Sequence, residues 1–228
     1  MDIMKKILIF SALLLISGIL IAQNPVAYLS AAKGSVDLMR SAKTFKPKRG
    51  DTLENKDQLK TGGESFASYK FIDGNTNIKV FANSVVNINT TILNGNLNKS
   101  VSITKGSVLS KVISGAGTFQ IETPTTVASV KGTGFLTKVA DNEQTLIIVT
   151  EGEVLVEVKD TGNIQSVSKG STARIEPNGS LSVDKTSQED INDLEKAEIA
   201  ADAASETKVM RIQVTDEQGN IKYIEVKY

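Results

Sequence analysis

The chain of 228 residues contains no histidine, no cysteine and no tryptophan. Histidine and cysteine are the usual protein ligands of zinc, copper, haem iron and iron–sulfur clusters, so the common forms of these sites are excluded. Serine–histidine and cysteine–histidine nucleophiles are excluded for the same reason. Without cysteine there is no disulfide and no lipid-bearing N-terminal thiol, so packing and strand pairing must hold the fold together. We expect no metal and no cofactor.

An excess of charge of either sign is also lacking. The 26 basic residues are balanced by 26 acidic residues, which argues against the basic surface that nucleic acid requires. A glycosidase needs two carboxyl groups at a defined separation. The acidic residues here stand mostly beside turn glycines, as Asp73 and Glu151 do, or in a predicted helix. These positions suit solvated turns and caps, so we predict a protein that is not an enzyme.

The N-terminus has the pattern of a secretory signal peptide. Lys5 and Lys6 precede an uncharged apolar run over residues 7–22, and Gln23 follows. A basic segment, an apolar segment and a small residue at the cut site are the three parts of such a signal. We predict a signal peptide over residues 1–22, cleaved after Ala22, and a periplasmic or secreted, cell-surface location. The alternative is an uncleaved membrane anchor, but the run is shorter than the ~20 apolar residues of a spanning helix.

Residues 23–183 read as one domain made of short β-strands. Valine, isoleucine, threonine and serine alternate in period two and are interrupted by glycine, asparagine and aspartate. We predict an all-β fold, a rolled two-layer β-sheet of the short β-solenoid or β-roll kind, with a β-sandwich as the alternative. The predicted strands cover residues 27–30, 35–40, 66–72, 77–81, 84–88, 101–104, 107–113, 118–123, 126–130, 135–141, 145–150, 153–159, 164–167 and 171–176.

A weak repeat runs through this domain. Gly34, Gly106, Gly152 and Gly170 each follow a charged residue and lie between two alternating apolar stretches. We interpret them as structural corners, where glycine adopts a positive φ or lets strands cross closely. The alternative is a ligand-binding loop that is used four times.

Residues 73–98 contain eight asparagines. Asparagine tolerates left-handed backbone angles and caps turns with its side chain, so we interpret most of them as turn residues. The alternative is a surface of amides that binds a glycan.

Two further segments follow the β-domain. Residues 184–206 are predicted to form a helical connector, because two overlapping capping boxes (Thr186 with Glu189, Ser187 with Asp190) open a stretch without glycine or proline. The thin apolar stripe of this helix favours light packing on the sheet over a partner-docking role. Residues 207–228 are predicted to form a β-hairpin, which must join the main sheet, pair with another chain or stay loosely attached.

The segment over residues 123–135 is the most specific motif of the chain. Pro124 forces the preceding residue into an extended conformation and marks the start of a strand. Two glycines, Gly132 and Gly134, then indicate a bulge or a sharp corner. The segment resembles the FecR-domain signature T-P-x-x-x-A-x-V-x-G-T-x-F. The matching residues are Thr123, Pro124, Ala128, Val130, Gly132, Thr133 and Phe135.

The resemblance to FecR domains extends over residues 26–183. Asp73 and Gly74 resemble the family's F-x-D-G-S element, and Gly152 stands in its V-x-x-G-x-V element. Gly134 departs from the signature, where a polar residue is common. The resemblance implies a periplasmic β-domain that recognises another protein. Its best-understood members are transmembrane anti-sigma regulators with a cytoplasmic helical domain. Only six residues precede the apolar run here, so we expect a stand-alone domain without that cytoplasmic region.

We therefore predict an extracytoplasmic, non-enzymatic binding or scaffold module that recognises another envelope protein, in signalling or otherwise, through unpaired strand edges. The alternative is a structural protein associated with cell-wall or surface glycan through residues 75–98. The signature residues are expected to be structural, with no catalytic, cofactor-binding or metal-binding role. Nucleic acid is not expected as a partner.

Overall fold

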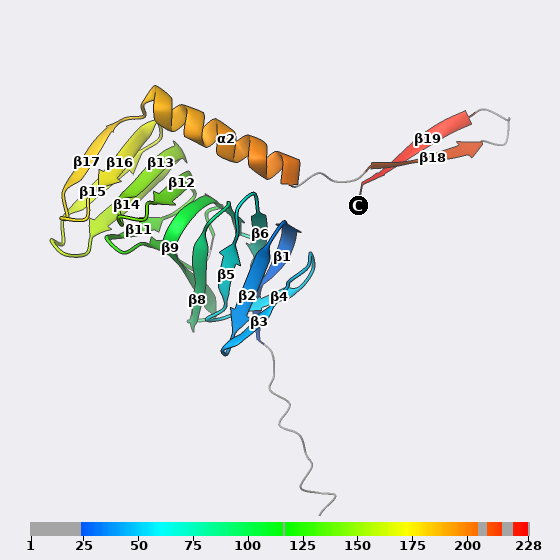
Figure 1. The fold of residues 1–228 in the computed structure, drawn as a ribbon, viewed down its shortest axis with the longest axis horizontal. Coiled ribbons are helices and arrows are strands. Elements are labelled where there is room, and N and C mark those ends of the chain that lie inside the picture. Colours follow the sequence, from blue (N-terminus) through cyan, green and yellow to red (C-terminus); the bar gives the residue numbers. More distant parts are fainter. Residues whose placement is uncertain (1–23, 116, 205–208, 216–220, 228) are drawn as a thin grey trace, which may run out of the picture.

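The structure is a computed structural model that describes residues 24–115, 117–204, 209–215 and 221–227, with side chains as far as Asp202. The predicted signal peptide lies outside the described residues. Two β-sheets pack face to face, a helix covers one of them, and a hairpin follows (Figure 1). Within the described ranges, no helix is long and apolar enough to cross a membrane.

The first layer, sheet A, forms by pairing of neighbours that are antiparallel throughout. Its strands are, in spatial order, β4 (Thr52–Glu54), β1 (Pro25–Lys33), β6 (Phe66–Phe71), β7 (Thr76–Val80), β9 (Asn96–Val112), β12 (Gly134–Val139), β13 (Thr145–Glu151), β16 (Ser171–Ile175) and β17 (Leu181–Lys185).

The second layer, sheet B, is antiparallel except for one parallel pair, β9 with β10. Its strands are β3 (Lys43–Phe45), β2 (Val36–Arg40), β5 (Gln58–Thr61), β8 (Val85–Leu93), β9, β10 (Phe119–Glu122), β11 (Thr126–Val130), β14 (Glu153–Val158) and β15 (Ile164–Ser168).

Strand β9 belongs to both layers. Its first part pairs with β8 and β10 in sheet B, and its last part, from Gly106 on, pairs with β7 and β12 in sheet A. The sheets are therefore one rolled sheet folded into two layers. The predicted all-β, rolled two-layer fold is confirmed, and the continuous β9 separates it from a sandwich of two independent sheets.

The repeated glycines lie where the chain passes from one layer to the other. Gly34, Gly106, Gly152 and Gly170 all have positive φ, between 73° and 97°. At Gly152 the space is also closed, because a Cβ atom would lie 2.5 Å from the carbonyl oxygen of Gly132. The interpretation of these glycines as structural corners is confirmed.

Serine side chains tie neighbouring corners together. Ser65 Oγ accepts a hydrogen bond from the backbone N–H of Ser35 at 2.9 Å, and Ser84 Oγ accepts one from Ser107 at 2.9 Å. Each acceptor lies against the glycine that precedes its donor, Gly34 or Gly106. The corners at Gly34 and Gly106 are thus each tied by a serine to a neighbouring turn between the layers.

The core lies between the two layers and is mainly apolar. Tyr69, Phe71, Phe119 and Phe135 are its largest fully buried side chains. Alternation along each strand places these residues inward and their neighbours outward. The core also buries polar hydroxyls: Tyr69 Oη is among the buried atoms of the described residues that have no hydrogen-bond partner.

The asparagine-rich segment is only partly explained by turns. Asn83 and Asn94 have positive φ and lie in turns, as predicted. Five other asparagines of the segment lie within strands, so the turn interpretation is wrong for them: Asn77, Asn87, Asn89, Asn96 and Asn98. Alternation in period two places several of their amides on a sheet face.

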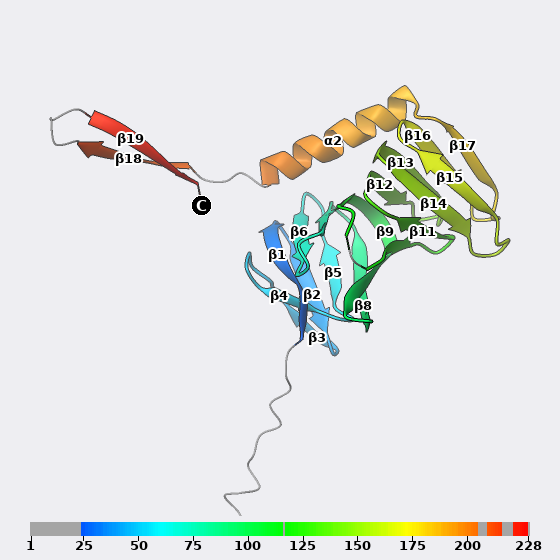
Figure 2. The same cartoon turned by 180° about the vertical axis from the view of Figure 1, so that it is seen from behind.

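Helix α2 (Gln188–Ala204) crosses the outer face of sheet A (Figure 2). Of the two predicted capping boxes, one is formed: the N–H of Asp190 donates to Ser187 Oγ, and the N–H of Ser187 donates to Asp190 Oδ2. Leu194, Ala197 and Ala201 of the helix pack against an apolar stripe on the sheet. Ile199 of the same helix is 69% exposed. The helix therefore uses small side chains for most of its contact.

The C-terminal strands β18 (Val209–Thr215) and β19 (Ile221–Lys227) pair antiparallel, from Val209 with Lys227 to Thr215 with Ile221. The predicted hairpin is thus present. It forms a two-stranded sheet of its own and, within the described residues, does not join the main sheet.

Candidate protein-binding edge

Four strands form the ends of the two layers: β4 and β17 in sheet A, and β3 and β15 in sheet B. An edge strand exposes unpaired backbone N–H and C=O groups, onto which another chain can add a strand. Proteins usually block such edges by shortness, charge or covering. The four edges of this fold differ sharply in this respect.

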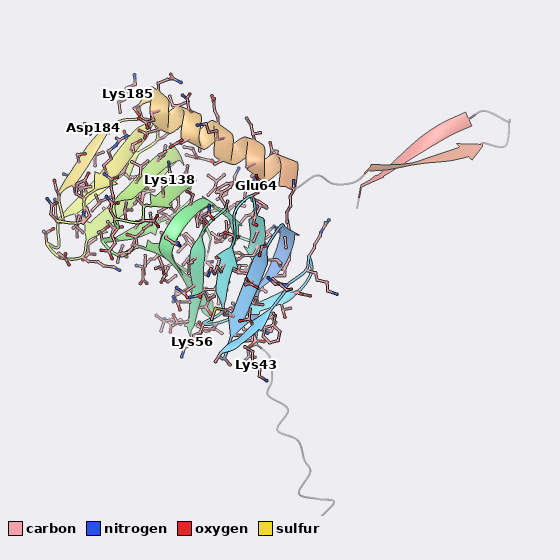
Figure 3. The ribbon with its side chains drawn as sticks, viewed as in Figure 1. Lys43, Lys56, Glu64, Lys138, Asp184 and Lys185 are labelled. Carbon is pink, nitrogen blue, oxygen red and sulfur yellow. The ribbon has the colours of Figure 1, made fainter. Side chains whose placement is uncertain are left out.

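Strands β3 and β4 are blocked by their length and their charges. Each has only three residues. β3 begins at Lys43 (Figure 3). It is followed closely by Lys46, which pairs with Asp37 at 2.7 Å. Lysine is a common protective residue at sheet edges.

Arg40 closes the edge at β4. Its guanidinium donates to both carboxylate oxygens of the buried Asp57, at 2.8 and 2.6 Å, to Glu54 Oε1 at 2.6 Å and to the carbonyl of Thr52 at 2.9 Å. The hydrogen bond to Asp57 raises the pKa of Arg40 above its usual value, and the charges of Asp57 and Glu54 add to this effect. The clamp ties β2 to β4 across the two layers and occupies a backbone acceptor of the edge.

Strand β17 is protected by charge. It carries Asp184 and Lys185, which Figure 3 shows beside the start of α2. Its neighbour β16 also carries Arg174, which forms an ion pair with Asp190 at 2.5 Å. A strand added here would have to accommodate charges of both signs.

Strand β15 has none of these protections. Its five residues, Ile-Gln-Ser-Val-Ser, include no charge and no proline. Ile164 is 53% exposed, and Ser166 and Ser168 are exposed as well. Within the described part of the chain, β15 pairs with β14 alone.

The phase of the ladder shows which backbone groups of β15 are free. The N–H of Lys169 bonds the carbonyl of Gly152, and the N–H of Val158 bonds the carbonyl of Asn163. Since hydrogen-bonded pairs alternate in an antiparallel ladder, Gln165 and Val167 bond β14. The residues whose N–H and C=O groups face away from β14 are Ile164, Ser166 and Ser168.

The side chains of those same residues lie on the outer face of sheet B. Their cross-strand partners on β14 are Glu157, Leu155 and Glu153. Leu155 is 47% exposed, and Ser166 Oγ donates to Glu153 Oε1. The free edge is therefore bordered by an exposed apolar centre between two glutamates. This surface, Ile164–Ser168 with the outward side chains of β14, is called the β15 edge below.

The signature residues, by contrast, lie in a turn, in the core and in a corner of the fold. Thr123 is buried, and its Oγ1 accepts the N–H of Thr126 at 3.0 Å and contacts the hydroxyls of Thr126 and Thr145 at 2.8 and 3.0 Å. Pro124 is exposed at the turn that this network closes. The threonine cluster thus stabilises the turn between β10 and β11.

The remaining signature residues fill the core and the corner. Ala128 and Phe135 are completely buried, whereas Val130 is half-buried and packs against the core. Gly132 has a φ of 70°, and Thr133 packs beneath Gly152. The structure brings Gly132, Thr133 and Gly152 together in one corner.

Asp73 and Gly74 form the turn between β6 and β7. Asp73 Oδ1 accepts the N–H of Asn75 at 3.1 Å, and Gly74 has a φ of 76°. The other oxygen, Oδ2, pairs with the ammonium group of Lys99, whose side chain is only 3% exposed. That ammonium also lies 5.9 Å from the centre of the Phe71 ring. The turn is thereby fixed to β9, a link that the sequence did not reveal.

A cleft of about 420 Å³ separates part of α2 from sheet A. Its floor is formed by Phe66, Phe81 and Leu136, and its roof by Ala197 and Ala200. Lys138 lines the cleft (Figure 3) and pairs with Asp193 of the helix. In this cleft the alanines of the helix lie opposite the two phenylalanines of the sheet. Within the described residues, no group of three or more acidic side chains gathers in a way that could hold a metal ion.

Sequence reasoning missed the β15 edge as a distinct surface. It placed a strand over 164–167, but its status as an edge depends on the spatial order of the strands. The absence of charge in this strand was the only signal available in the sequence.

Comparisons with known proteins agree with this fold. Residues 57–155 match the family model described as FecR protein, which confirms the FecR resemblance over that range. Two crystal structures of a protein of Parabacteroides distasonis, assigned as an anti-sigma factor, share the fold, each with a TM-score of 0.51 and 14% identity. The superpositions cover 71% of this chain and 70% of that chain in one case, and 75% and 83% in the other. No curated protein sequence matches this chain.

Proposed function

We propose that this chain is an extracytoplasmic, non-enzymatic binding module of the FecR type, which recognises another envelope protein by strand addition at the β15 edge. The FecR match over residues 57–155 supports a regulatory, signalling role, and so does the fold shared with a protein assigned as an anti-sigma factor. The observation that carries the proposal is the unprotected edge. Of the four end strands described, β3 and β4 have only three residues and β17 carries charged side chains, whereas β15 has five residues and no charge of its own.

Strand addition fits the chemistry of this edge. Three residues, Ile164, Ser166 and Ser168, supply backbone donors and acceptors in a row, and main-chain hydrogen bonds give such complexes their affinity. Specificity then comes from alternate side chains. Leu155 and Ile164 would contact apolar side chains of the added strand, and Glu153 and Glu157 would favour basic ones.

A photo-crosslinking amino acid at position 166 tests this function in the native envelope. The same amino acid at Ser182, an exposed residue of β17, is the matched control. We expect one specific protein adduct from position 166 and none from position 182. Equal labelling from both positions, or none from position 166, would contradict recognition at this edge.

The extracytoplasmic location rests on residues 1–22. Mass spectrometry of the mature protein should find an N-terminus at Gln23. An intact Met1 in the membrane fraction would instead show that the segment is retained as an anchor.

A glycan-binding role is the second candidate, and the outer face of sheet B favours it. Gln58 Nε2 donates to Asn87 Oδ1 at 2.9 Å, and Asn89 Nδ2 donates to Ser102 Oγ at 3.2 Å. Rows of amides and hydroxyls suit sugar hydroxyls. Retention of the protein on purified cell wall, lost in an Asn87→Ala and Asn89→Ala double variant but kept with Ser166→Pro, would support this role over protein recognition.

A further inference from the structure

The β18–β19 hairpin and the β15 edge each have unpaired backbone groups along a strand. The β18–β19 hairpin forms a two-stranded sheet of its own, and an isolated hairpin of this kind is marginal in water. The β15 edge is a five-residue strand with one free side and no protection. Addition of the β18–β19 hairpin to β15 would give the hairpin a larger sheet and would pair the free side of β15.

The β15 edge of the same chain is not the edge nearest to the connection of the hairpin. Helix α2 begins beside β16, where Asp190 pairs with Arg174, and ends near β1 and β6, where Ala200 lines a cleft with Lys33. Its 17 residues span about 25 Å. The five steps from Ala204 to Val209 span at most about 18 Å, and β15 lies in the other layer, beyond the start of the helix (Figure 1). Among the described residues, the hairpin is not paired with the β15 edge of its own chain, so the edge of another molecule is open to it.

Charge favours the same contact. Strands β18 and β19 contain three basic residues, Arg211, Lys222 and Lys227, and one acidic residue, Glu225. The β15 edge is bordered by Glu153 and Glu157. Pairing of two β15 edges with each other would place like-charged glutamates on one face and would leave both hairpins without a sheet.

We propose that the β18–β19 hairpin of one copy adds to the β15 edge of a second copy, so that copies join head to tail. This inference rests on the proposed function of the β15 edge and names its occupant as a second copy of the chain. The contact is heterologous, because each copy donates a hairpin and accepts one. Repetition of such a contact builds open chains and not a closed pair.

Cysteine cross-linking tests the contact directly, because the natural chain has no cysteine. A Ser166→Cys protein is mixed with a second protein that carries one cysteine in the hairpin, at Ile212 or Gln213 of β18 or at their cross-strand partners Ile224 and Tyr223. Neighbouring positions of one strand point to opposite faces of the sheet. One of Ile212 and Gln213, and one of Tyr223 and Ile224, therefore shares the face of position 166. A short bismaleimide should yield the mixed dimer, identified by mass.

A proline at position 166 tests the role of the free backbone. The N–H of Ser166 faces away from β14, so Ser166→Pro removes a donor of the free edge and leaves the β14–β15 ladder intact. Ser166→Ala is the matched control, since it loses the same hydroxyl and keeps the N–H. In sedimentation velocity, we expect the wild type and Ser166→Ala to form species larger than a dimer as concentration rises. Ser166→Pro should weaken association by roughly tenfold or more.

The outcomes separate this inference from the proposed function. A monomer at all concentrations, or a Ser166→Cys dimer with itself in place of the mixed dimer, would overturn the head-to-tail contact. If position 166 nevertheless captures a different envelope protein, recognition at the β15 edge stands without self-assembly. If neither contact forms, both proposals fail.

Discussion

At the scale of single residues, the core of this protein contains a tyrosine whose buried hydroxyl has no hydrogen-bond partner among the described residues. This residue, Tyr69, is fully buried, and burial raises the pKa of its phenol. An unsatisfied buried polar group costs stability. The ring itself is well used, because it packs edge-on against Phe71 with centres 5.7 Å apart.

Replacing Tyr69 by phenylalanine should therefore stabilise the fold. We expect Tyr69→Phe to raise the free energy of unfolding by about 1 kcal/mol in urea denaturation, because the ring packing stays and the desolvated hydroxyl is removed. Tyr28→Phe, at a residue that is 40% exposed, is the control and should change little. A loss of stability in Tyr69→Phe would show that the hydroxyl has a partner in solution.

The corner glycines allow a second residue-scale test. Gly152 and Gly170 have nearly the same φ, 75° and 79°, but only Gly152 has atoms close to where a Cβ would lie. Gly170→Ala should cost about 1 kcal/mol, the strain of a left-handed alanine. Gly152→Ala should cost about 3 kcal/mol or more, since a clash with Gly132 is added. Equal losses in urea denaturation would mean that close packing of the corner contributes nothing.

At the scale of elements, α2 is held to the sheet by its first turn and a few small side chains. Burial acts to raise the pKa of Asp190, but hydrogen bonds from Ser187 and Arg174 outweigh it, so its pKa lies below the usual value. A carboxyl whose folded-state pKa is depressed stabilises the fold above its unfolded pKa, and this stabilisation is lost as the pH falls through the folded value.

The contribution of Asp190 should therefore depend on pH in a defined direction. Asp190→Asn should lower the free energy of unfolding by a constant amount above about pH 4, near the ordinary pKa of a carboxyl. The difference from the wild type should shrink as the pH falls below that value. Urea titrations from pH 7 to pH 2.5 measure this, with Asp184→Asn on the exposed part of β17 as the control. A difference that does not change with pH would show that the ion pair with Arg174 is not formed.

Most strands of the roll followed from the sequence, because period-two alternation and corner glycines are local signals. The strands β3, β4, β5 and β17 were not predicted, and three of them are end strands of the layers. The capping box at Ser187 and the pairing of β18 with β19 are local as well. Ion pairs between segments that are distant in the chain could not be predicted from the sequence. The pairing of Asp73 with Lys99, and of Arg40 with Asp57, joins residues that meet only after the sheet has rolled. Five asparagines were wrongly predicted to lie in turns, because asparagine is found both in turns and at outward-facing positions of a strand.

At the scale of the whole molecule, the candidate site is a consequence of strand order. The sequence predicted that unpaired edges would be the binding surfaces, yet it could not say which strands lie at the ends of the layers. The order of the folded sheet leaves four ends, and the protections on β3, β4 and β17 distinguish β15. The conspicuous signature at Thr123–Phe135 belongs instead to a turn, the core and a corner.

The most direct test of this account is residue-resolved amide exchange along β15. In the dilute, free protein, the amides of Gln165 and Val167 should exchange slowly, and those of Ile164, Ser166 and Ser168 should exchange quickly. Addition of the protein captured at position 166, or of concentrated chain, should slow the three fast amides. Slow exchange of all five in the dilute protein, or fast exchange that no partner changes, would contradict recognition at the β15 edge.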